Sequence, residues 1–218
     1  MKWDATPPDD PPAAELEFNF RSGRLCLAFV ATVGERWRRN IERLRDPADL
    51  ARWYREAGLL DETVTVTPAG LDTARAVREA VHRCAKALIA GRPAAEADEA
   101  LINAAAAAAP LVPVLRRGAA RLTTPAPGAE SAALSTVARD AVDLFTGALA
   151  ARVRECESPE CALLFVDTSR PGRRRWCSSA ACGSRDRSAA YRRRRRAGAP
   201  GQPARLEPPD NRPGRSAG

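Results

Sequence analysis

Four of the six cysteines stand at regular intervals in the C-terminal third of the sequence. They form the pattern C-x4-C-x15-C-x4-C, which is two close pairs separated by fifteen residues. A zinc ion takes four thiolates in a tetrahedron, and a tight turn between two nearby cysteines can supply two of them. The pattern therefore predicts one structural Zn2+ ion with four metal ligands, which are Cys156, Cys161, Cys177 and Cys182.

The four-cysteine pattern also limits the chemistry of the metal. Four thiolates fill the coordination sphere and leave no position for an activated water, so we do not expect a hydrolytic centre. The spacing differs from the ferredoxin patterns, which favours zinc over an iron–sulfur cluster. A segment of about 45 residues is too small for a sufficient core of its own, so metal binding and folding of this segment should be coupled.

Arginine is concentrated around the same cysteines. Residues 152–196 hold 13 arginines and 5 acidic residues, whereas the rest of the chain holds 22 residues of each charge. Guanidinium groups bind phosphate oxygens with paired hydrogen bonds, and they can bind guanine in the major groove in the same way. The predicted nucleic-acid contacts are Arg173, Arg174, Arg175, Arg185, Arg187, Arg192, Arg193, Arg194, Arg195 and Arg196.

This charge pattern leaves three classes of partner open. An arginine-rich helix on a rigid module favours a DNA duplex, because phosphate contacts supply much of the affinity for DNA. Arginine-rich helices also fit RNA, although Tyr191 is the single aromatic residue of this stretch that could stack on a base. The third alternative is a protein-interaction adaptor, in which zinc stabilises a scaffold and the arginines contact an acidic partner.

The remaining reactive side chains do not form a catalytic pattern. His82 is the single histidine, and no nucleophile motif accompanies it, so we expect that the protein is not an enzyme. Cys26 and Cys84 stand among apolar residues, where free cysteine behaves as a small buried hydrophobe. All three side chains are expected to pack in the core.

The sequence shows neither a targeting segment nor a membrane anchor. It has no run of about 18 apolar residues, and its first residues lack the apolar region of a signal peptide. We therefore expect a cytoplasmic protein, in which cysteines stay reduced and metal binding is favoured over disulfides.

The first part of the chain is expected to be mainly helical. Residues 24–37 predict an early buried helix, because apolar side chains leave it little polar face, with a strand as the alternative for the first half of this segment. Two further helices are expected over 46–58 and 67–91, since each begins with a capping residue followed by proline and each stops at a glycine.

Three more elements are expected before the first cysteine pair. An alanine-rich helix should fill 93–109, and residues 112–124 allow a short hairpin that turns at Gly118. A last long helix is expected over 131–154, with Ala148 among its inward residues. This helix would deliver the chain directly to the first cysteine.

Between the cysteine pairs the sequence predicts a strand at 163–166, a turn at 169–172 and a return strand at 174–176, and a helix after the second pair. Phe165 and Trp176 are expected to pack over the metal site. Asp167 should organise the turn through local hydrogen bonds, or alternatively orient an arginine of the return strand.

Together these elements predict a mainly α fold. A helical N-terminal domain, with at most one small β-hairpin, precedes a small ββα, treble-clef-like zinc finger. The expected parts are a disordered leader at 1–14, the helical domain at 15–151, the zinc finger with its basic helix at 152–196, and a disordered tail at 197–218.

The cysteine segment resembles the CGNR zinc-finger family, and the match includes its F-V-D-T-S and R-R-W-C stretches. The upstream stretch R-S-G-R-L-C-L-A-F-V-A-T-V, followed by the helix through Trp53 and Gly58, is similar to the ABATE domain that usually accompanies this finger. The resemblance implies a bacterial, stress-induced transcription regulator, with the four cysteines as zinc ligands and the arginines as DNA contacts. Its N-terminal domain would sense an unidentified signal or mediate assembly, for example as a homodimer.

The sequence departs from the family pattern at several positions. Ser184 replaces the Asn of the family's tetrapeptide, whereas Gly183 and Arg185 are kept. Ala28 and Ala31 stand where the family usually has Asp and Asn. Because serine can still cap a helix, we expect the finger to fold, with any base contact of the Asn amide lost or altered.

Overall fold

The computed structural model describes residues 12–60, 64–124 and 128–197, with side chains described through Arg192. Most of the predicted leader and tail, residues 1–11 and 198–218, lies outside the described residues. Within the leader, however, Ala13–Leu16 forms a 3-10 turn, and Glu15 of this turn pairs with Arg39 at 2.8 Å. The last two residues of the predicted leader, Ala13 and Ala14, belong to this turn.

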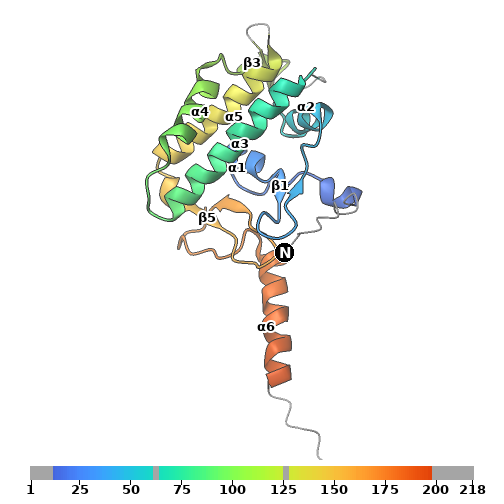
Figure 1. The fold of residues 1–218 in the computed structure, drawn as a ribbon, viewed down its shortest axis with the longest axis vertical. Coiled ribbons are helices and arrows are strands. Elements are labelled where there is room, and N and C mark those ends of the chain that lie inside the picture. Colours follow the sequence, from blue (N-terminus) through green and yellow to red (C-terminus); the bar gives the residue numbers. More distant parts are fainter. Residues whose placement is uncertain (1–11, 61–63, 125–127, 198–218) are drawn as a thin grey trace, which may run out of the picture.

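A layer of long helices forms the body of the molecule (Figure 1). Helices α3 (Pro68–Ile89), α4 (Glu96–Ala107) and α5 (Ala129–Thr146) pack against one another. The short α1 (Leu25–Val30) lies against α3 and α5, and α2 (Pro47–Glu56) packs beside α3. The mainly α fold is thus confirmed.

Local capping sets the ends of α2 and α3 where the sequence predicts them. The side chain of Asp46 accepts the backbone N–H of Asp49, and the side chain of Thr67 accepts that of Gly70. Both helices have proline in their first turn, where its missing N–H costs nothing. Each is followed by a glycine with positive φ, a conformation that glycine adopts without a Cβ clash.

Helix α1 is confirmed as a buried helix, but it is shorter than predicted and ends at Val30. Its first backbone N–H groups have no partner within the helix, and Asp140 of α5 accepts the one of Cys26 at 2.8 Å. Arg24 also binds Asp140, at 2.8 Å. A carboxylate at a helix N-terminus is favourable because it meets the positive end of the helix dipole, so α5 fixes the position of α1.

The last long helix differs from the prediction. Helix α5 ends at Thr146, Ala148 is exposed, and a 3-10 turn at Ala150–Arg152 leads into a strand. A Cβ at Gly147 would lie 2.5 Å from the carbonyl oxygen of Asp143, so the chain leaves the helix at a residue without one. The helix over 131–154 was therefore predicted too long.

The helical part carries two β-hairpins, one more than predicted. The expected hairpin is confirmed as β3 (Val112–Arg116) and β4 (Ala119–Thr123), and it turns through Arg117 and Gly118, both with positive φ. A second, very short pair joins β1 (Val33–Gly34) to β2 (Ile41–Glu42). Its loop brings residues 35–40 next to the zinc-binding segment, as the contacts below show.

The cysteine segment begins with a third hairpin, which shares the helical core. Strand β5 (Val153–Glu155) pairs antiparallel with β6 (Leu164–Val166). Val153, Leu164 and Val166 belong to the main hydrophobic core, whereas Phe165 faces the cysteines. The return strand predicted at 174–176 is wrong, because the partner of β6 precedes the first cysteine. The ββα order itself is retained, with α6 as its helix.

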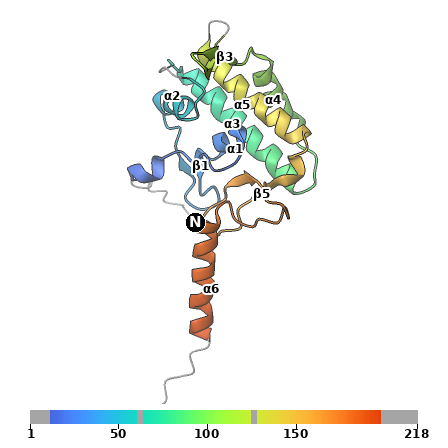
Figure 2. The same cartoon turned by 180° about the vertical axis from the view of Figure 1, so that it is seen from behind.

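A π-helical turn (Ser179–Gly183), which contains Cys182, leads into α6 (Ser184–Ala197). The helix predicted at this position is confirmed. It extends away from the body in both views (Figures 1 and 2), and its main packing partner is the turn that precedes it. Among the described residues, no helix is both long and apolar enough to cross a membrane.

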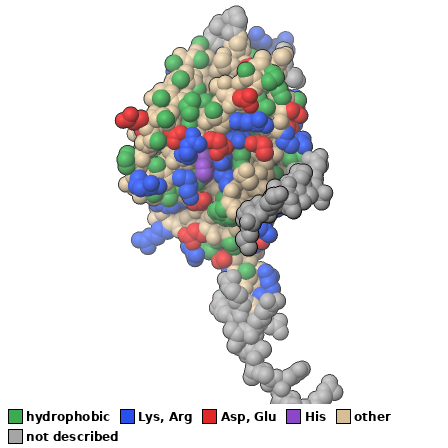
Figure 3. Space-filling model, in the orientation of Figure 1, with side chains coloured by type: hydrophobic (Ala, Val, Ile, Leu, Met, Phe, Trp, Pro, Cys, Tyr) green, Lys and Arg blue, Asp and Glu red, His purple; other side chains and the backbone are tan. Residues whose placement is uncertain are grey.

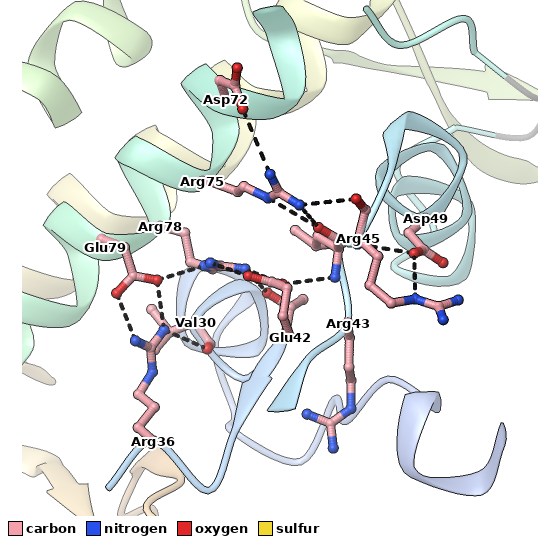
Figure 4. A network of polar contacts seen from close by, with 12 residues as sticks. Val30, Arg36, Glu42, Arg43, Arg45, Asp49, Asp72, Arg75, Arg78 and Glu79 are labelled. Carbon is pink, nitrogen blue, oxygen red and sulfur yellow. Dashed lines mark hydrogen bonds and ion pairs between the residues drawn. The ribbon is translucent and has the colours of Figure 1, made fainter. Parts of the chain in front are cut away.

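A buried arginine ties α3 to the β1–β2 hairpin (Figure 4). Arg78, which is 3 % exposed, donates to both carboxylate oxygens of Glu42 at 2.7 Å. It also donates to Glu79 at 2.9 Å and to Thr32 at 3.1 Å. Since Glu79 in turn pairs with Arg36 at 2.6 Å, the network holds the hairpin rigidly beside α3.

Candidate metal centre and nucleic-acid interface

The hairpin β5–β6 positions the first cysteine pair. Cys156 follows β5 directly, and its backbone N–H donates to the carbonyl of Leu163 at 2.9 Å, which extends the ladder by one residue. The chain then turns, and the N–H of Cys161 donates to the carbonyl of Ser158 at 3.0 Å. Ala162 takes a positive φ of 54°, which returns the chain to β6. The two thiols are thereby brought to one end of the hairpin.

The π-helical turn positions the second pair. Ser178 caps it, because its side chain accepts the backbone N–H of Ala181 at 3.1 Å. This turn places Cys182 close to Cys177, with 3.7 Å between the two Sγ atoms. Helix α6 begins two residues after Cys182, so the fourth cysteine fixes the start of the basic helix.

The four thiols form one cluster whose size fits a zinc ion. Their Sγ atoms all lie within 4.8 Å of one another, and those of Cys161 and Cys177 are 3.7 Å apart. In a tetrahedron with Zn–S bonds of about 2.3 Å, the sulfurs are about 3.8 Å apart. Cys156, Cys177 and Cys182 are buried and Cys161 is partly exposed. A single structural zinc ion fits this cluster, as predicted.

A backbone hydrogen bond favours the thiolate form of Cys156, because the N–H of Cys177 points at its sulfur, at 3.4 Å. In the chain without metal, the thiols of Cys161 and Cys177 donate to the same sulfur, which lowers the pKa of Cys156 and raises the pKa of the two donors. Since zinc binds deprotonated cysteine, the backbone N–H of Cys177 supports metal binding at Cys156.

Apolar side chains surround the cluster. Phe165 is 1 % exposed and packs with Leu163 and Ala31 against the cysteines, and Trp176 packs at its edge. The predicted packing of Phe165 and Trp176 over the metal site is confirmed. Ala31 comes from the end of α1, so the metal site is enclosed in part by the helical domain.

Asp167 organises the turn between the cysteine pairs. Its carboxylate accepts the backbone N–H of Ser169 at 2.9 Å and that of Arg174 at 2.8 Å. Burial alone raises the pKa of this carboxyl, but the hydrogen bonds from Ser169 and Arg174 outweigh it and lower the pKa to about 2. The predicted role of Asp167 in organising the turn is therefore confirmed, and its bond to Arg174 is to the backbone N–H and not to the guanidinium.

The arginines of the turn differ in their availability. Arg174 donates to the carbonyl of Cys177 at 2.6 Å and lies over the ring of Phe165, 5.0 Å from its centre. Arg175 pairs with Glu157 at 2.6 Å and lies over Trp176. Arg173 is exposed. Arg174 and Arg175 of the predicted basic edge thus have contacts within the finger, whereas Arg173 is exposed, and the prediction that the three arginines contact nucleic acid stays a prediction.

The helix arginines lie on an exposed element. Arg185, Arg187 and Arg192 are exposed. Arg187 donates a long hydrogen bond to the carbonyl of Ser179, at 3.4 Å. Arg193, Arg194, Arg195 and Arg196 belong to the same helix, and their side chains lie outside the described ones.

Sequence reasoning missed the contribution of the β1–β2 loop to this surface. Trp37 is 51 % exposed and donates from its indole nitrogen to the carbonyl of Pro159 at 3.0 Å. Arg38 lies 3.8 Å from Glu160. Both partners belong to the first cysteine turn, more than a hundred residues away in sequence, so no local pattern could have shown the contact.

Two family comparisons agree with this architecture. Residues 23–148 match the ABATE family, described as "Putative stress-induced transcription regulator", and residues 152–195 match the CGNR zinc finger. No curated protein matches the chain. Both descriptions fit a regulatory, zinc-binding role. Because the first match covers more than half of the sequence, the chain belongs to the ABATE family, and a CGNR zinc finger follows its ABATE domain.

Proposed function

We propose that the protein is a DNA-binding transcription regulator that contacts the duplex with α6. The observation that carries this proposal is the attachment of an exposed, arginine-rich helix to the fourth cysteine of a rigid zinc site. The major groove of B-DNA is wide enough for an α-helix. Because α6 extends clear of the body (Figure 1), it could enter the groove without a clash from the helical domain.

The distribution of charge supports a role for α6 rather than for the body. On the face seen in Figure 3, basic and acidic side chains are interleaved over the helical body. Several body arginines are paired with carboxylates, as are Arg24 with Asp140 and Arg36 with Glu79. In α6, by contrast, Asp186 is the single acidic residue in a run that contains seven arginines. The unbalanced positive charge is thus on the helix that is free to meet phosphate.

Zinc has a structural role in this proposal. With four thiolates the ion has no open position for a substrate or water, and we propose no catalytic step. The ABATE domain would sense a signal or mediate assembly, which supplies regulation to a finger that by itself covers too little DNA for genomic specificity.

The test is binding of duplex DNA by the zinc-loaded protein across a salt series. If roughly five phosphates are neutralised, log affinity should fall with log salt at a slope of about −4 to −5. The double variant Arg187→Gln, Arg192→Gln should reduce the slope by about 2. Arg116→Gln is the matched control, because this exposed arginine lies in β3, at the end of the molecule opposite α6 (Figure 1).

Two further arms separate the alternatives. Cys177→Ser should lose both zinc and DNA binding, since the zinc site anchors the start of α6. Stronger competition by single-stranded RNA than by duplex DNA would indicate an RNA-binding protein. Salt-independent binding, or none in the wild-type protein, would overturn the proposal and favour the adaptor with an acidic protein partner.

A further inference from the structure

A cavity lies where the helical domain meets the zinc finger. It measures about 210 Å³, and its walls come from the residues around α1, the β1–β2 hairpin and both cysteine turns. The lining residues include four arginines and two acids: Arg21, Arg36, Arg43, Arg185, Glu35 and Glu160. Three of the arginines belong to the helical domain, and Arg185 belongs to the first turn of α6. The cavity is therefore basic and spans both parts of the chain.

Arg43 is a partly buried cation of this cavity whose hydrogen bonding is incomplete. Its side chain is half-buried, and its Nε is fully buried and has no hydrogen-bond partner among the described residues. Its one hydrogen bond there is a long one, from Nη1 to the carbonyl of Ala31 at 3.4 Å. In Figure 4 its guanidinium points away from the carboxylates of the neighbouring network, and no contact joins it to them.

The three carboxylates that interact electrostatically with Arg43 are already paired with other arginines. Glu42 is held by Arg78 at 2.7 Å. Glu35 and Glu15 both bind Arg39, at 2.7 Å and 2.8 Å. Each of these acids raises the pKa of Arg43, but burial of its guanidinium outweighs them and lowers it. In the described part of the chain, the guanidinium of Arg43 thus has no carboxylate as a counter-ion.

The absence of a side chain at Gly34 leaves the space that the guanidinium of Arg43 occupies. A Cβ at this position would lie 2.6 Å from Nη1 of Arg43 and 3.0 Å from Nη2. The planar group therefore lies directly on the backbone of β1, in a space that any other residue would fill. This contact with the backbone orients the guanidinium and removes part of its hydration. Loss of hydration costs free energy when a cation has no counter-ion.

We propose that the junction cavity binds a small phosphate-type oxyanion, with Arg43 as its main donor and Arg21 and Arg185 as further cations. A guanidinium presents two parallel N–H groups to such an anion. Arg21 and Arg185 are exposed at the cavity and have no carboxylate within 4 Å among the described residues. The bound oxyanion would contact both the helical domain and the first turn of α6. Binding of the anion would therefore help to fix the position of the basic helix.

The test uses the zinc-loaded full chain without nucleic acid, so that its outcome is independent of DNA binding. Inorganic phosphate is titrated at constant ionic strength against chloride, with thermal unfolding and calorimetry as readouts. Phosphate should bind saturably and raise the Tm. Malonate, in a second arm, distinguishes a carboxylate ligand from a phosphate ligand.

Arg43→Met should weaken phosphate binding at least tenfold, and in the absence of phosphate it should be no less stable than the wild type. Arg116→Met, which removes an exposed arginine far from the cavity, should bind phosphate as the wild type does. Gly34→Ala is the second variant, because its methyl group displaces the guanidinium while the arginine is kept. It too should bind phosphate more weakly.

Three results would overturn the proposal. The first is the absence of saturable phosphate binding by the wild type. The second is equal phosphate affinity in Arg43→Met, and if that variant also loses zinc, Arg43 is a counter-ion of the zinc thiolates instead. The third is tighter binding of malonate than of phosphate, which would identify the ligand as a carboxylate.

Discussion

The carboxylate of Asp167 accepts the backbone N–H of Arg174 at 2.8 Å, and this bond closes the turn between the two cysteine pairs. Its other oxygen accepts the N–H of Ser169. In Asp167→Asn one of these donors would face an amide N–H2 group, so we expect the free energy of unfolding to fall by about 1–3 kcal/mol. Urea unfolding of the zinc-loaded protein measures this loss. Thr168→Ala, next to it but exposed, is the control and should change stability little.

Arg173 and Arg174 are adjacent but should behave differently. Arg174 bonds the carbonyl of Cys177 and lies over Phe165, so Arg174→Ala should destabilise the finger by about 2 kcal/mol and speed the loss of zinc to a chelator. Arg173→Ala should leave stability and zinc retention unchanged. Under the DNA-binding proposal, it should lower the salt slope by about 0.9. The opposite pattern would show that the roles of the two arginines are exchanged.

The pair of buried Arg78 and partly buried Glu42 should be more costly to break than to replace. Glu42→Met leaves Arg78 without its main counter-ion, so we expect a loss of about 3 kcal/mol. In the double variant Arg78→Met, Glu42→Met both charges are gone, and the loss should be smaller than the sum of the losses in Glu42→Met and Arg78→Met. Urea unfolding of the wild type, the two single variants and the double variant gives the coupling energy. Additive losses would mean that the two side chains contribute independently.

His82 makes stability depend on pH in a defined window. Burial and the neighbouring Arg36 lower its pKa to about 4 from an ordinary value of 6.5. Between these values the unfolded chain binds more protons than the folded one, so stability is full above pH 6.5 and falls as the pH drops toward 4. His82→Gln should gain about 1 kcal/mol on the wild type at pH 5.5 relative to pH 7.5, after allowance for solvent screening.

The measurement for His82 is the difference between the unfolding free energies of the two proteins at each pH. Protonation of the zinc thiolates affects both proteins alike and cancels in this difference. A difference that does not change with pH would show that His82 keeps its ordinary pKa in the folded protein.

The features that could be predicted from the sequence are those that depend on neighbours along the chain. The cysteine spacing predicts the metal site, because two residues a few positions apart can share one turn. The caps at Asp46 and Thr67 and the stops at the following glycines are likewise local. The concentration of arginine after Cys182 is visible in the order of the residues alone. Each of these depends on short-range backbone geometry or on covalent proximity.

The features that only the tertiary structure decided depend on residues far apart in sequence. The sequence predicts a helix at Val153, whereas Val153 lies in a strand and pairs with Val166, because both bury their side chains in the helical core. The sequence does not show that Arg174 contacts the carbonyl of Cys177 and the ring of Phe165. Nor does it show the isolation of Arg43, which follows from the pairing of Glu15, Glu35 and Glu42 with other arginines. Packing decides which strand and which charge finds a partner, and no local pattern records that choice.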